Sequence, residues 1–527
     1  MKQAVQAERK GGPMGRLKTY LKNVAILTVT GLGLRAAGMF FRVYIAARIG
    51  AEGMGLYQLI FTLYSLCITV ATAGVSVAAT RLAAEELARP QPGRAKGVLG
   101  RVMALALAFG FAAGVVQLVL AWPAARYWLG DIRAAPSLAL LAPSLPFMAV
   151  GSAARGYFFA RRKVGPNVVS QIFEQIIRIV LVLLILPGAV QRGVQYACAA
   201  VLVGSMVSEV VSTLLVMWYY RRDLNRTFGD APAQVPKGTS GRIWRILAPV
   251  EGGRCLDSAL HTVENTLVPA CLLAFLGSRE ESLAQFGALK GMAMPILLFP
   301  FSFLTPLATL LMPEVTEAHI LGRQKTLETL VGRIMLFTTT FSVLAGGLIA
   351  LYAYPLGRIL YHDETIGFYL AVLAPVLPGM YLDAMGDSIL KGLGEEVATF
   401  RYSIWDSLIR IGLVILLMPR MGMKGFLFVM ICSNVLSALL NIFRIEKVAR
   451  IHTRWYRWFV QPALIFLISA VLGQGALRLV GVSGDWPQLL LGCVVTGGLY
   501  CLLMLRFGLW DAVQAILTRR KPAGSAA

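Results

Sequence analysis

Long apolar runs recur from one end of this 527-residue chain to the other, and they constrain its fold more than any other feature. Each run has roughly 17 to 25 residues, the length that an α-helix needs to cross the hydrocarbon core of a bilayer. With 57% hydrophobic and 15% charged residues and a mean hydropathy of +0.68, the composition excludes a water-soluble globular protein. The sequence therefore predicts an all-α, polytopic membrane protein with about fourteen transmembrane helices.

The predicted spans follow one another without an intervening soluble domain. They are Val24–Ala47, Leu56–Thr80, Val98–Ala121, Leu138–Phe159, Val168–Leu186, Val194–Trp218, Leu256–Leu276, Phe286–Met312, Ile334–Tyr354, Phe368–Leu390, Ser403–Met418, Phe426–Phe443, Phe459–Val480 and Leu489–Leu505. The first run is long, contains two arginines and is followed at once by another complete span. We therefore interpret it as the first helix and not as a cleaved signal peptide.

A net charge of +23 would suggest nucleic-acid binding in a soluble protein, but the positions of the charges indicate otherwise. Most Lys and Arg residues fall in alternate connections, on the same side as the N-terminus. Under the positive-inside rule, this pattern places both termini in the cytoplasm and predicts no nucleic-acid partner. Basic clusters such as 161–163 and 444–450 are expected to lie beside anionic membrane lipids.

The seven cysteines lie in or at the ends of apolar runs, and no two form a CxxC pair. This pattern predicts neither disulfides nor a metal site. The sequence also lacks a G-x-x-x-x-G-K-[ST] loop, so nothing indicates an ATP-driven pump. We expect no cofactor.

The chain resembles itself at a constant offset of 232 residues. Gly100–Met103 aligns with Gly332–Met335, and the P-S-L-P sequence of Pro143–Pro146 aligns with the P-V-L-P of Pro375–Pro378. Six predicted spans separate equivalent points, and because six is even the two copies enter the membrane with the same orientation. Parallel repeats of this kind predict two six-helix lobes, followed by two further helices, with a substrate site near mid-bilayer.

This repeat divides the chain into six predicted segments. They are a cytoplasmic N-terminal segment (1–22), an N-lobe (23–222), a cytoplasmic linker (223–242), a C-lobe (243–450), helices thirteen and fourteen (451–507) and a cytoplasmic tail (508–527).

The region around the end of the first span carries a family resemblance. From Arg42 the sequence reads RVYIAARIGAEGMGLYQL, and the most specific part of the match extends from Arg35 to Glu86. With the duplication and the fourteen-span layout, this resembles the stage V sporulation protein B branch of the polysaccharide transporters, in the superfamily of multidrug, oligosaccharidyl-lipid and polysaccharide exporters.

The resemblance implies a multi-pass protein of the bacterial plasma membrane related to the lipid II flippases. It implies two lobes around a cationic cavity, with the last two helices forming a groove for a polyprenyl tail. The implied function is translocation of an undecaprenyl-pyrophosphate-linked sugar precursor of the cell wall or another polysaccharide by alternating access, not an enzymatic reaction.

Charged residues inside predicted spans are the candidate functional residues, because a charge at the bilayer centre is costly. Arg35 and Arg42 are two helical turns apart and share one face of the first span. Arginine pairs well with phosphate oxygens, so both are expected to bind the diphosphate of the substrate. For each of the two, pairing with a helix carboxylate or extension toward the interface is the alternative.

The seventh span carries an ionisable stripe of Arg254, Asp257, His261 and Glu264. We assign Arg254 to substrate phosphate, and Asp257 or Glu264 to a coupling cation, Na⁺ or H⁺. Salt bridging is an equal alternative for the two carboxylates. We interpret His261 as a packing residue.

Two further candidates, Lys290 and Asp383, lie in the second half of the chain. Lys290 is expected to face the cavity. Asp383 lies one turn from Asp387 and is expected to pair with a cavity arginine or to act in ion coupling. Structural pairing is the alternative for both Lys290 and Asp383. Two acid–arginine pairs at repeat-equivalent positions are predicted to be structural ion pairs: Glu174 with Arg178, and Asp406 with Arg410.

Three other functions compete with the flippase. A cation-coupled multidrug antiporter would share the fold but favour acidic cavity walls. A membrane glycosyltransferase or polymerase would need larger external loops with catalytic carboxylates. A scaffold would leave the membrane arginines without a purpose. The sequence does not distinguish the sugar, the coupling ion, the oligomeric state, or a role in sporulation from one in vegetative growth.

Overall fold

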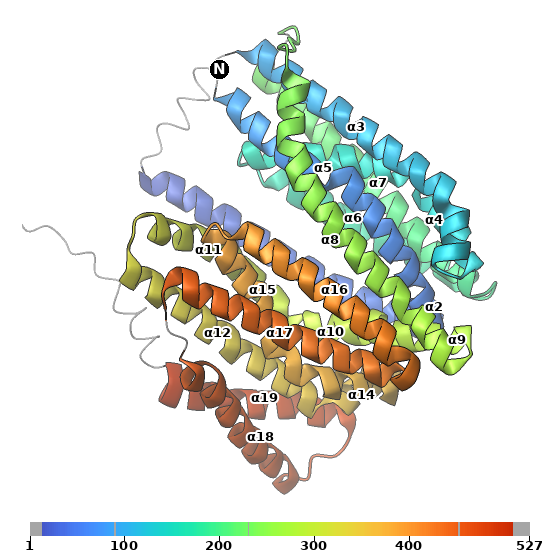
Figure 1. Cartoon of the computed structure of the whole chain (residues 1–527), viewed down its shortest axis with the longest axis vertical. Coiled ribbons are helices and arrows are strands. Elements are labelled where there is room, and N and C mark those ends of the chain that lie inside the picture. Colours follow the sequence, from blue (N-terminus) through green and yellow to red (C-terminus); the bar gives the residue numbers. More distant parts are fainter. Residues whose placement is uncertain (1–12, 89–90, 230, 452–453, 510–527) are drawn as a thin grey trace, which may run out of the picture. The chain divides into compact units, whose positions relative to one another are not determined.

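The computed structural model describes residues 13–88, 91–229, 231–451 and 454–509, and these ranges are almost entirely helical. The first twelve residues of the predicted N-terminal segment and residues 510–527 of the predicted tail lie outside this description. The chain forms two compact units, Met1–Gly287 and Ala288–Ala527 (Figure 1).

The first unit is a bundle of long helices. Its α-helices are α2 (Pro13–Leu87), α3 (Pro92–Pro123), α4 (Ala135–Leu141), α5 (Ser144–Ala160), α6 (Gly165–Val190), α7 (Val194–Phe228), α8 (Thr239–Leu276) and α9 (Arg279–Phe286). A π-helical turn, η1 (Ala124–Trp128), and a 3₁₀ turn, η2 (Ile132–Ala134), connect α3 to α4. Helix α2 contacts α3, α5 and α8, and therefore forms the centre of this unit.

Helix α2 is too long for a single crossing, and a glycine divides it. Its 75 residues would extend over about 110 Å if straight. Gly50 has φ 71° and ψ −179°, a conformation that side-chain-bearing residues rarely adopt, and it bends the chain there. The two parts of α2 correspond to the first two predicted spans.

Two glycines, Gly55 in α2 and Gly287 directly after α9, allow the second part of α2 to meet this segment backbone to backbone. A Cβ atom added to Gly55 would lie 2.0 Å from the carbonyl oxygen of Leu283, and one added to Gly287 would lie 2.0 Å from that of Ala51. Only glycine fits at such contacts, as is common where membrane helices cross closely. The glycines of the G-A-E-G-M-G segment thus have two distinct roles, a bend at Gly50 and close packing at Gly55.

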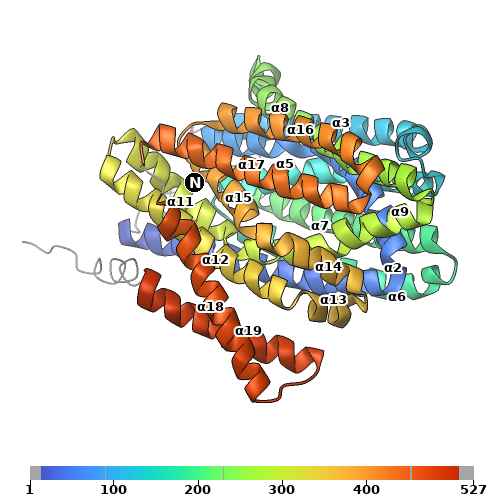
Figure 2. The same cartoon turned by 60° about the horizontal axis from the view of Figure 1, so that its bottom comes forward.

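The second unit contains shorter and more broken helices (Figure 2). They are η3 (Gly287–Ala293), α10 (Met294–Leu298), η4 (Pro300–Phe303), α11 (Thr305–Ile320), α12 (Gln324–Leu351), α13 (Ala353–Tyr361), α14 (Glu364–Leu373), η5 (Ala374–Val376), α15 (Leu377–Gly392), α16 (Glu396–Met421), α17 (Met423–Ala449), η6 (Tyr456–Val460), α18 (Gln461–Leu479), α19 (Asp485–Met504) and η7 (Leu505–Leu509). Pro295 and Pro300 each lie in the first turn of a short segment, and Pro306 near the start of α11, where proline is tolerated.

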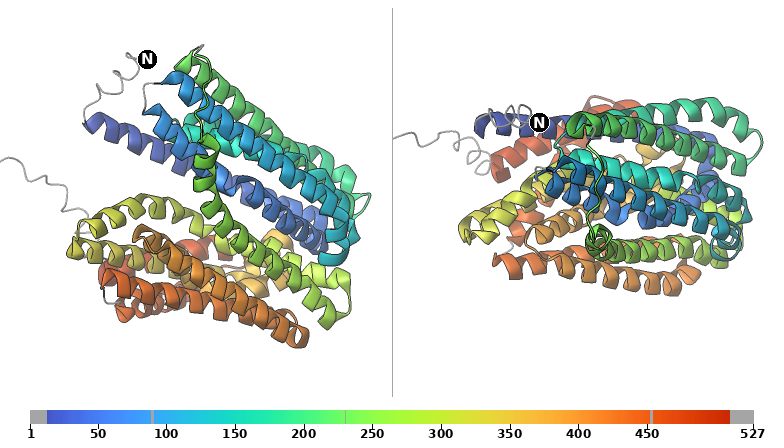
Figure 3. Two further views of the ribbon diagram at one scale, coloured as in Figure 1. Left: turned by 45° about the horizontal axis from the view of Figure 1, so that its top comes forward. Right: turned by 90° about the horizontal axis from the view of Figure 1, so that it is seen from above.

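Antiparallel helix pairs organise the second unit. Helices α16 and α17 lie side by side across the short connection at Gly422, and their orange ribbons remain adjacent in both views of Figure 3. Helices α18 and α19 form a second pair, in which Phe466 and Tyr500 pack edge to face, with ring centroids 5.9 Å apart. Leu344 and Leu348 of α12 pack against this pair.

The internal duplication predicted from the sequence is visible in the helix boundaries. Helices α4 and α14 end at Leu141 and Leu373, and α5 and α15 end at Ala160 and Gly392; both differences are 232 residues. The chain breaks at both proline loops, between α4 and α5 and again at η5. The two halves of the chain thus repeat one order of helices.

The predicted spans correspond to helices of suitable length and composition. Within the described residues, 12 helices are long and apolar enough to cross a membrane, or 13 if the bent pair Ile132–Leu141 and Ser144–Ala160 is one span. In that count α2 is a single helix, although it covers two predicted spans. Helices α8 and α9 pack within the first unit, whereas the repeat assigns residues 243–287 to the second lobe; that lobe boundary stays a prediction.

Candidate transport site

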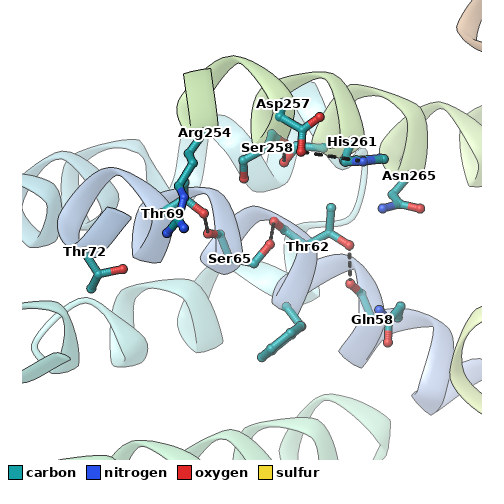
Figure 4. A pocket seen from close by; sticks show the side chains of 12 residues that line it. Gln58, Thr62, Ser65, Thr69, Thr72, Arg254, Asp257, Ser258, His261 and Asn265 are labelled. Atoms are coloured by element: carbon teal, nitrogen blue, oxygen red, sulfur yellow. Dashed lines mark hydrogen bonds and ion pairs between the residues drawn. The ribbon is translucent and has the colours of Figure 1, made fainter. Parts of the chain in front are cut away.

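A polar pocket of about 440 Å³ lies between the second part of α2 and α8, both in the first unit (Figure 4). Helix α2 contributes Gln58, Phe61, Thr62, Ser65, Thr69 and Thr72, and α8 contributes Arg254, Asp257, Ser258, His261, Thr262 and Asn265. Eleven of these twelve side chains are polar, in helices that are otherwise apolar. A concentration of so many polar groups between two otherwise apolar helices of a membrane protein indicates a binding site or a solvated pathway.

The α2 wall is a regular stripe. Its polar residues from Gln58 to Thr72 follow spacings of four, three, four and three, so they lie on one helical face. Each hydroxyl donates its hydrogen to a carbonyl of its own helix, as in the 2.8 Å bond from Thr62 Oγ1 to the carbonyl of Gln58 and the 2.9 Å bond from Thr69 Oγ1 to that of Ser65. The hydroxyl oxygens therefore remain hydrogen-bond acceptors toward the pocket.

The α8 wall carries the charged groups. Arg254 lies opposite Thr69 at one end of the pocket, and Asp257 and His261 follow along the same face (Figure 4). His261 Nε2 is 4.0 Å from Asp257 Oδ2, and its Nδ1 is 3.6 Å from Oε2 of Glu264, whose side chain is buried. The imidazole thus lies between a pocket carboxylate and a buried carboxylate.

A polar contact joins α2 and α8 beyond the Arg254 end of the pocket. The backbone N–H of Gly74 donates a 2.7 Å hydrogen bond to Glu251 Oε2. A Cβ atom at Gly74 would lie 2.9 Å from Leu247 Cγ, so glycine is needed for the helices to approach this closely. This contact fixes the separation of the two pocket walls at one end.

The other end of the pocket carries two carboxamides, Gln58 on α2 and Asn265 on α8. Gln58 Oε1 and Asn265 Oδ1 are buried, and neither accepts a hydrogen bond. An unpaired buried acceptor typically costs about 1–3 kcal/mol.

A second polar cavity of about 360 Å³ lies in the first unit, lined by Leu34, Arg155, Gln171, Glu174 and Gln175. Arg155 forms an ion pair with Glu209 of α7 at 3.4 Å. The other polar residues of this cavity lie within about one turn of α6.

The two arginines predicted for the diphosphate lie on the first part of α2. Arg35 is exposed and Arg42 is partly exposed. Neither lines the pocket that contains Arg254, and neither lines the second cavity, although Leu34 does. The structure therefore does not bring Arg35 or Arg42 together with Arg254 in either pocket, and their role stays a prediction.

The predicted candidates of the second unit have local partners. The Lys290 ammonium lies 5.4 Å from the centre of the Phe426 ring, a cation–π contact. Asp383 Oδ1 accepts a 2.8 Å hydrogen bond from the side-chain amide of Asn441. These contacts fit the structural alternative that the sequence left open.

Both predicted acid–arginine pairs are present. Glu174 and Arg178 are 2.5 Å apart, and Asp406 and Arg410 are 2.8 Å apart. Ser433 of α17 donates a 2.5 Å hydrogen bond to Asp406 Oδ1, which ties the second pair to the neighbouring helix. Glu174 also lines the second cavity, so that pair is accessible from a polar space.

Three features of these sites were not predicted from the sequence: the polar stripe of α2, the carboxamide of Asn265, and the ion pair between Arg155 and Glu209. The stripe could have been recognised, because Gln58, Thr62, Ser65, Thr69 and Thr72 recur at helical spacing inside an apolar run. The Arg155 pair joins residues 54 positions apart and required the fold.

Within the described residues, no group of three or more His, Cys, Asp or Glu side chains is arranged to hold a metal ion. The seven cysteines are free thiols.

Comparison with solved structures defines the class of protein. The fold matches that of the lipid II flippase MurJ in its inward closed conformation, with a TM-score of 0.69 and 12% identity over 93% of this chain and all of that one. It also matches a multidrug resistance MATE family transporter of the MOP superfamily, with a TM-score of 0.63 and 15% identity over 80% of this chain and 99% of that one. The chain is thus a polytopic membrane protein with the fold of these transporters.

The chain belongs to the polysaccharide biosynthesis protein family, whose model matches residues 20–319, more than half of its length. It is 28% identical to stage V sporulation protein B of Bacillus subtilis (strain 168), over 93% of this chain and 96% of that protein. It is 24% identical to the lipid II flippase MurJ of the same organism, over 95% of this chain and 97% of that one. This is a family of transporters and not of enzymes, as the sequence predicted, which removes the glycosyltransferase alternative.

Proposed function

We propose that this protein translocates an undecaprenyl-pyrophosphate-linked sugar precursor of peptidoglycan or a related polysaccharide, by alternating access. The observation that carries the proposal is the polar pocket between α2 and α8, which holds a cation, a carboxylate and many hydroxyls in a chain built of apolar spans. A lipid-linked sugar has a polar headgroup that needs such a surface, while its tail stays in the bilayer.

Arg254 supports the diphosphate part of the proposal. A guanidinium remains charged at any cellular pH and makes paired hydrogen bonds to phosphate oxygens. The hydroxyl stripe of α2 lies opposite, and its acceptor oxygens suit the O–H groups of a sugar. Arg35 and Arg42 are proposed to attract the diphosphate along the first part of α2.

Ion coupling is proposed for the same pocket. Asp257 lines the pocket and His261 joins it to Glu264, so protonation or Na⁺ binding at these groups would change the charge beside Arg254. Asp383 is kept as a second candidate for coupling. Anionic lipids are proposed partners of the basic clusters.

The test is flipping of fluorescent undecaprenyl-pyrophosphate-linked sugars in proteoliposomes. We expect Arg254→Ala to reduce the initial rate at least tenfold, because about 1.4 kcal/mol of phosphate binding corresponds to one factor of ten. Arg35→Ala and Arg42→Ala are expected to reduce it as well. Arg245→Ala is the matched control, since Arg245 is an exposed arginine on α8 outside the pocket. Equal rates for Arg254→Ala and Arg245→Ala would contradict the role of Arg254.

A cation-coupled multidrug antiporter is the second candidate, and the acidic groups Asp257 and Glu264 favour it. It predicts export of cationic dyes from the same proteoliposomes, driven by a proton or sodium gradient. Dye export without flipping of any lipid-linked sugar would replace the flippase proposal with this one.

A further inference from the structure

The connection between α7 and α8 is docked on the first turns of α3. The structure describes residues 229 and 231–238 of this connection. The backbone N–H of Gln234 donates a 2.9 Å hydrogen bond to the carbonyl of Gly93, and Lys96 Nζ donates a 3.4 Å hydrogen bond to that of Gly229. The segment that the sequence predicts to be a linker between lobes therefore lies against a helix of the first unit.

Two glycines of α3 allow this contact. A Cβ atom added to Gly97 would lie 2.2 Å from the carbonyl oxygen of Gln234, and one added to Gly93 would lie 2.5 Å from that of Pro232. Both clashes are with backbone atoms, so a side-chain rotation cannot relieve them. The connection and α3 meet backbone to backbone, which a loosely attached linker does not require.

A buried carboxylate fastens the start of α8 beside the connection. The Glu86 side chain, at the end of α2, is 1% exposed, and its two oxygens lie 3.1 Å from Arg94 Nε of α3 and 3.1 Å from Arg242 Nη1 of α8. Arg242 also forms an ion pair with Glu85 at 2.7 Å. Separation of α8 from α2 and α3 at this end would leave the buried Glu86 charge with one arginine fewer, which is strongly unfavourable.

The opposite end of α8 is attached to the first unit as well. The indole N–H of Trp128, in η1, donates a 3.0 Å hydrogen bond to Thr266 Oγ1 of α8. Arg279, at the start of α9, donates a hydrogen bond to the carbonyl of Leu129. Between the two ends, the hydrogen bond from the Gly74 N–H holds α8 to α2. Helix α8 is thus joined to the preceding helices at both ends and in between.

These contacts bear on which parts of the chain move together. The internal repeat assigns α8 to the second lobe, and rocking of that lobe against the first would part α8 from α2 and α3 at one end or the other. In the structure both ends are joined. Transport with α8 in the second lobe would therefore break the buried Glu86 pair or the Trp128 contact in each cycle.

We infer that residues 229 and 231–242 form a strap that keeps α8 on the helices of the N-lobe, so that α8 moves together with α2 and α3 during transport. The inference rests on the proposed function, because it concerns which helices move in alternating access. It implies that the walls of the α2–α8 pocket keep their separation, and that access to the pocket changes through movement of other helices.

Two cross-links test the inference, one at each end of α8. Phe109 of α3 and Trp244 of α8 pack edge to face, with ring centroids 5.4 Å apart. Trp128 and Thr266 form the hydrogen bond at the other end. These four side chains lie outside the pocket lining. Each pair is replaced by two cysteines in a full-length protein without its native cysteines. A short bis-methanethiosulfonate reagent then joins the two thiols by bonds that reduction cleaves.

Flipping of fluorescent undecaprenyl-pyrophosphate-linked sugars is compared in proteoliposomes before and after reduction. We expect both cross-linked proteins to flip the lipid at the rate of their reduced forms, because α8 does not part from the first unit at either end. Proteins with one cysteine of each pair, treated with the same reagent, are the controls. Flipping that either cross-link abolishes and reduction restores would overturn the inference.

Spin labels on the same two pairs give an answer that does not depend on flipping. Both pairs should show the same dipolar broadening in the purified protein with and without undecaprenyl pyrophosphate. Loss of the broadening at either pair on addition of this lipid would show that α8 separates there, and would overturn the inference.

A pair of variants tests the strap itself. Gly97→Ala places a Cβ against the strap, whereas Gly100→Ala, one turn further along α3, meets no atom within 4 Å. Hydrogen exchange of the strap amides should be about tenfold faster in Gly97→Ala than in the wild type, and unchanged in Gly100→Ala. Equal exchange in the two variants would show that the strap is not docked and would overturn the inference.

The outcomes separate the strap from the transport proposal. Flipping by the wild type that is lost in either cross-linked protein would leave the flippase proposal intact and overturn the inference. Constant dipolar broadening at both pairs and faster exchange in Gly97→Ala, without flipping of any lipid-linked sugar by the wild type, would support the inference and overturn the flippase proposal.

Discussion

The contact between α2 and α9 makes Gly55→Ala a sharp test of the structure. The added Cβ would lie 2.0 Å from the carbonyl oxygen and 2.7 Å from the carbonyl carbon of Leu283. Ordinary contacts begin at 3.4 Å, so the two backbones must separate by about 1.4 Å (3.4 minus 2.0). Overpacking of this kind typically costs about 1–3 kcal/mol, while helix propensity returns up to about 1 kcal/mol. We expect a net loss of stability of about 1–2 kcal/mol, seen as a fall of about 1–2 °C in the unfolding temperature of the detergent-purified protein.

The control for this prediction is Gly100→Ala. Gly100 lies within α3 and no atom lies within 4 Å of the position of its added Cβ, so alanine should leave stability unchanged or raise it slightly. Because the clash at Gly55 is with backbone atoms, the additional substitution Leu283→Ala should not restore stability. Either rescue by Leu283→Ala or equal unfolding temperatures for Gly55→Ala and Gly100→Ala would refute the backbone contact.

Three further predictions concern polar contacts. Arg133→Ala removes the guanidinium that lies 2.9 Å from the buried carboxylate of Asp131, and it should destabilise the purified protein by about 1–3 kcal/mol in thermal unfolding. Arg126→Ala is the control, since it replaces an exposed arginine, and it should leave stability unchanged. Glu251→Leu should lower the unfolding temperature more than Glu251→Gln, because glutamine retains an oxygen that can accept from the Gly74 N–H; equal effects would contradict this. Ser433→Ala should cost about 1 kcal/mol, measured in the same way, by removing the 2.5 Å hydrogen bond that ties α17 to the ion pair of α16.

The spans could be predicted from the sequence because membrane insertion depends on the summed apolarity of about twenty consecutive residues. The two parts of α2 were predicted as separate spans, but their union in one bent, continuous helix was not, since it depends on one backbone conformation at Gly50. Because the helix continues through that bend, a count of helices gives one element where the sequence predicts two spans. The duplication was also predictable, because the proline loops and the acid–arginine pairs recur at one offset in the sequence. In the structure, helices end at both proline loops.

The candidate site was predicted only along one helix at a time. Arg254, Asp257 and His261 share a helical face, so their placement in one pocket followed from spacing. The α2 wall was missed because threonine and serine satisfy their hydroxyls on their own backbone and do not interrupt an apolar run. The partner of Lys290 was missed for another reason: Phe426 lies 136 positions away along the chain, and only the fold brings them together.

The oxygen stripe on α2 has a consequence for movement as well as for binding. Because the residues from Thr62 to Thr72 repeat at intervals of three or four, equivalent acceptors recur about every 5 Å along the helix axis. A polar group that moves along this wall can exchange its hydrogen bond to one hydroxyl oxygen for a hydrogen bond to the next. Such a surface has several shallow minima in place of one deep one, as conduction pathways require if a solute is to leave as readily as it enters.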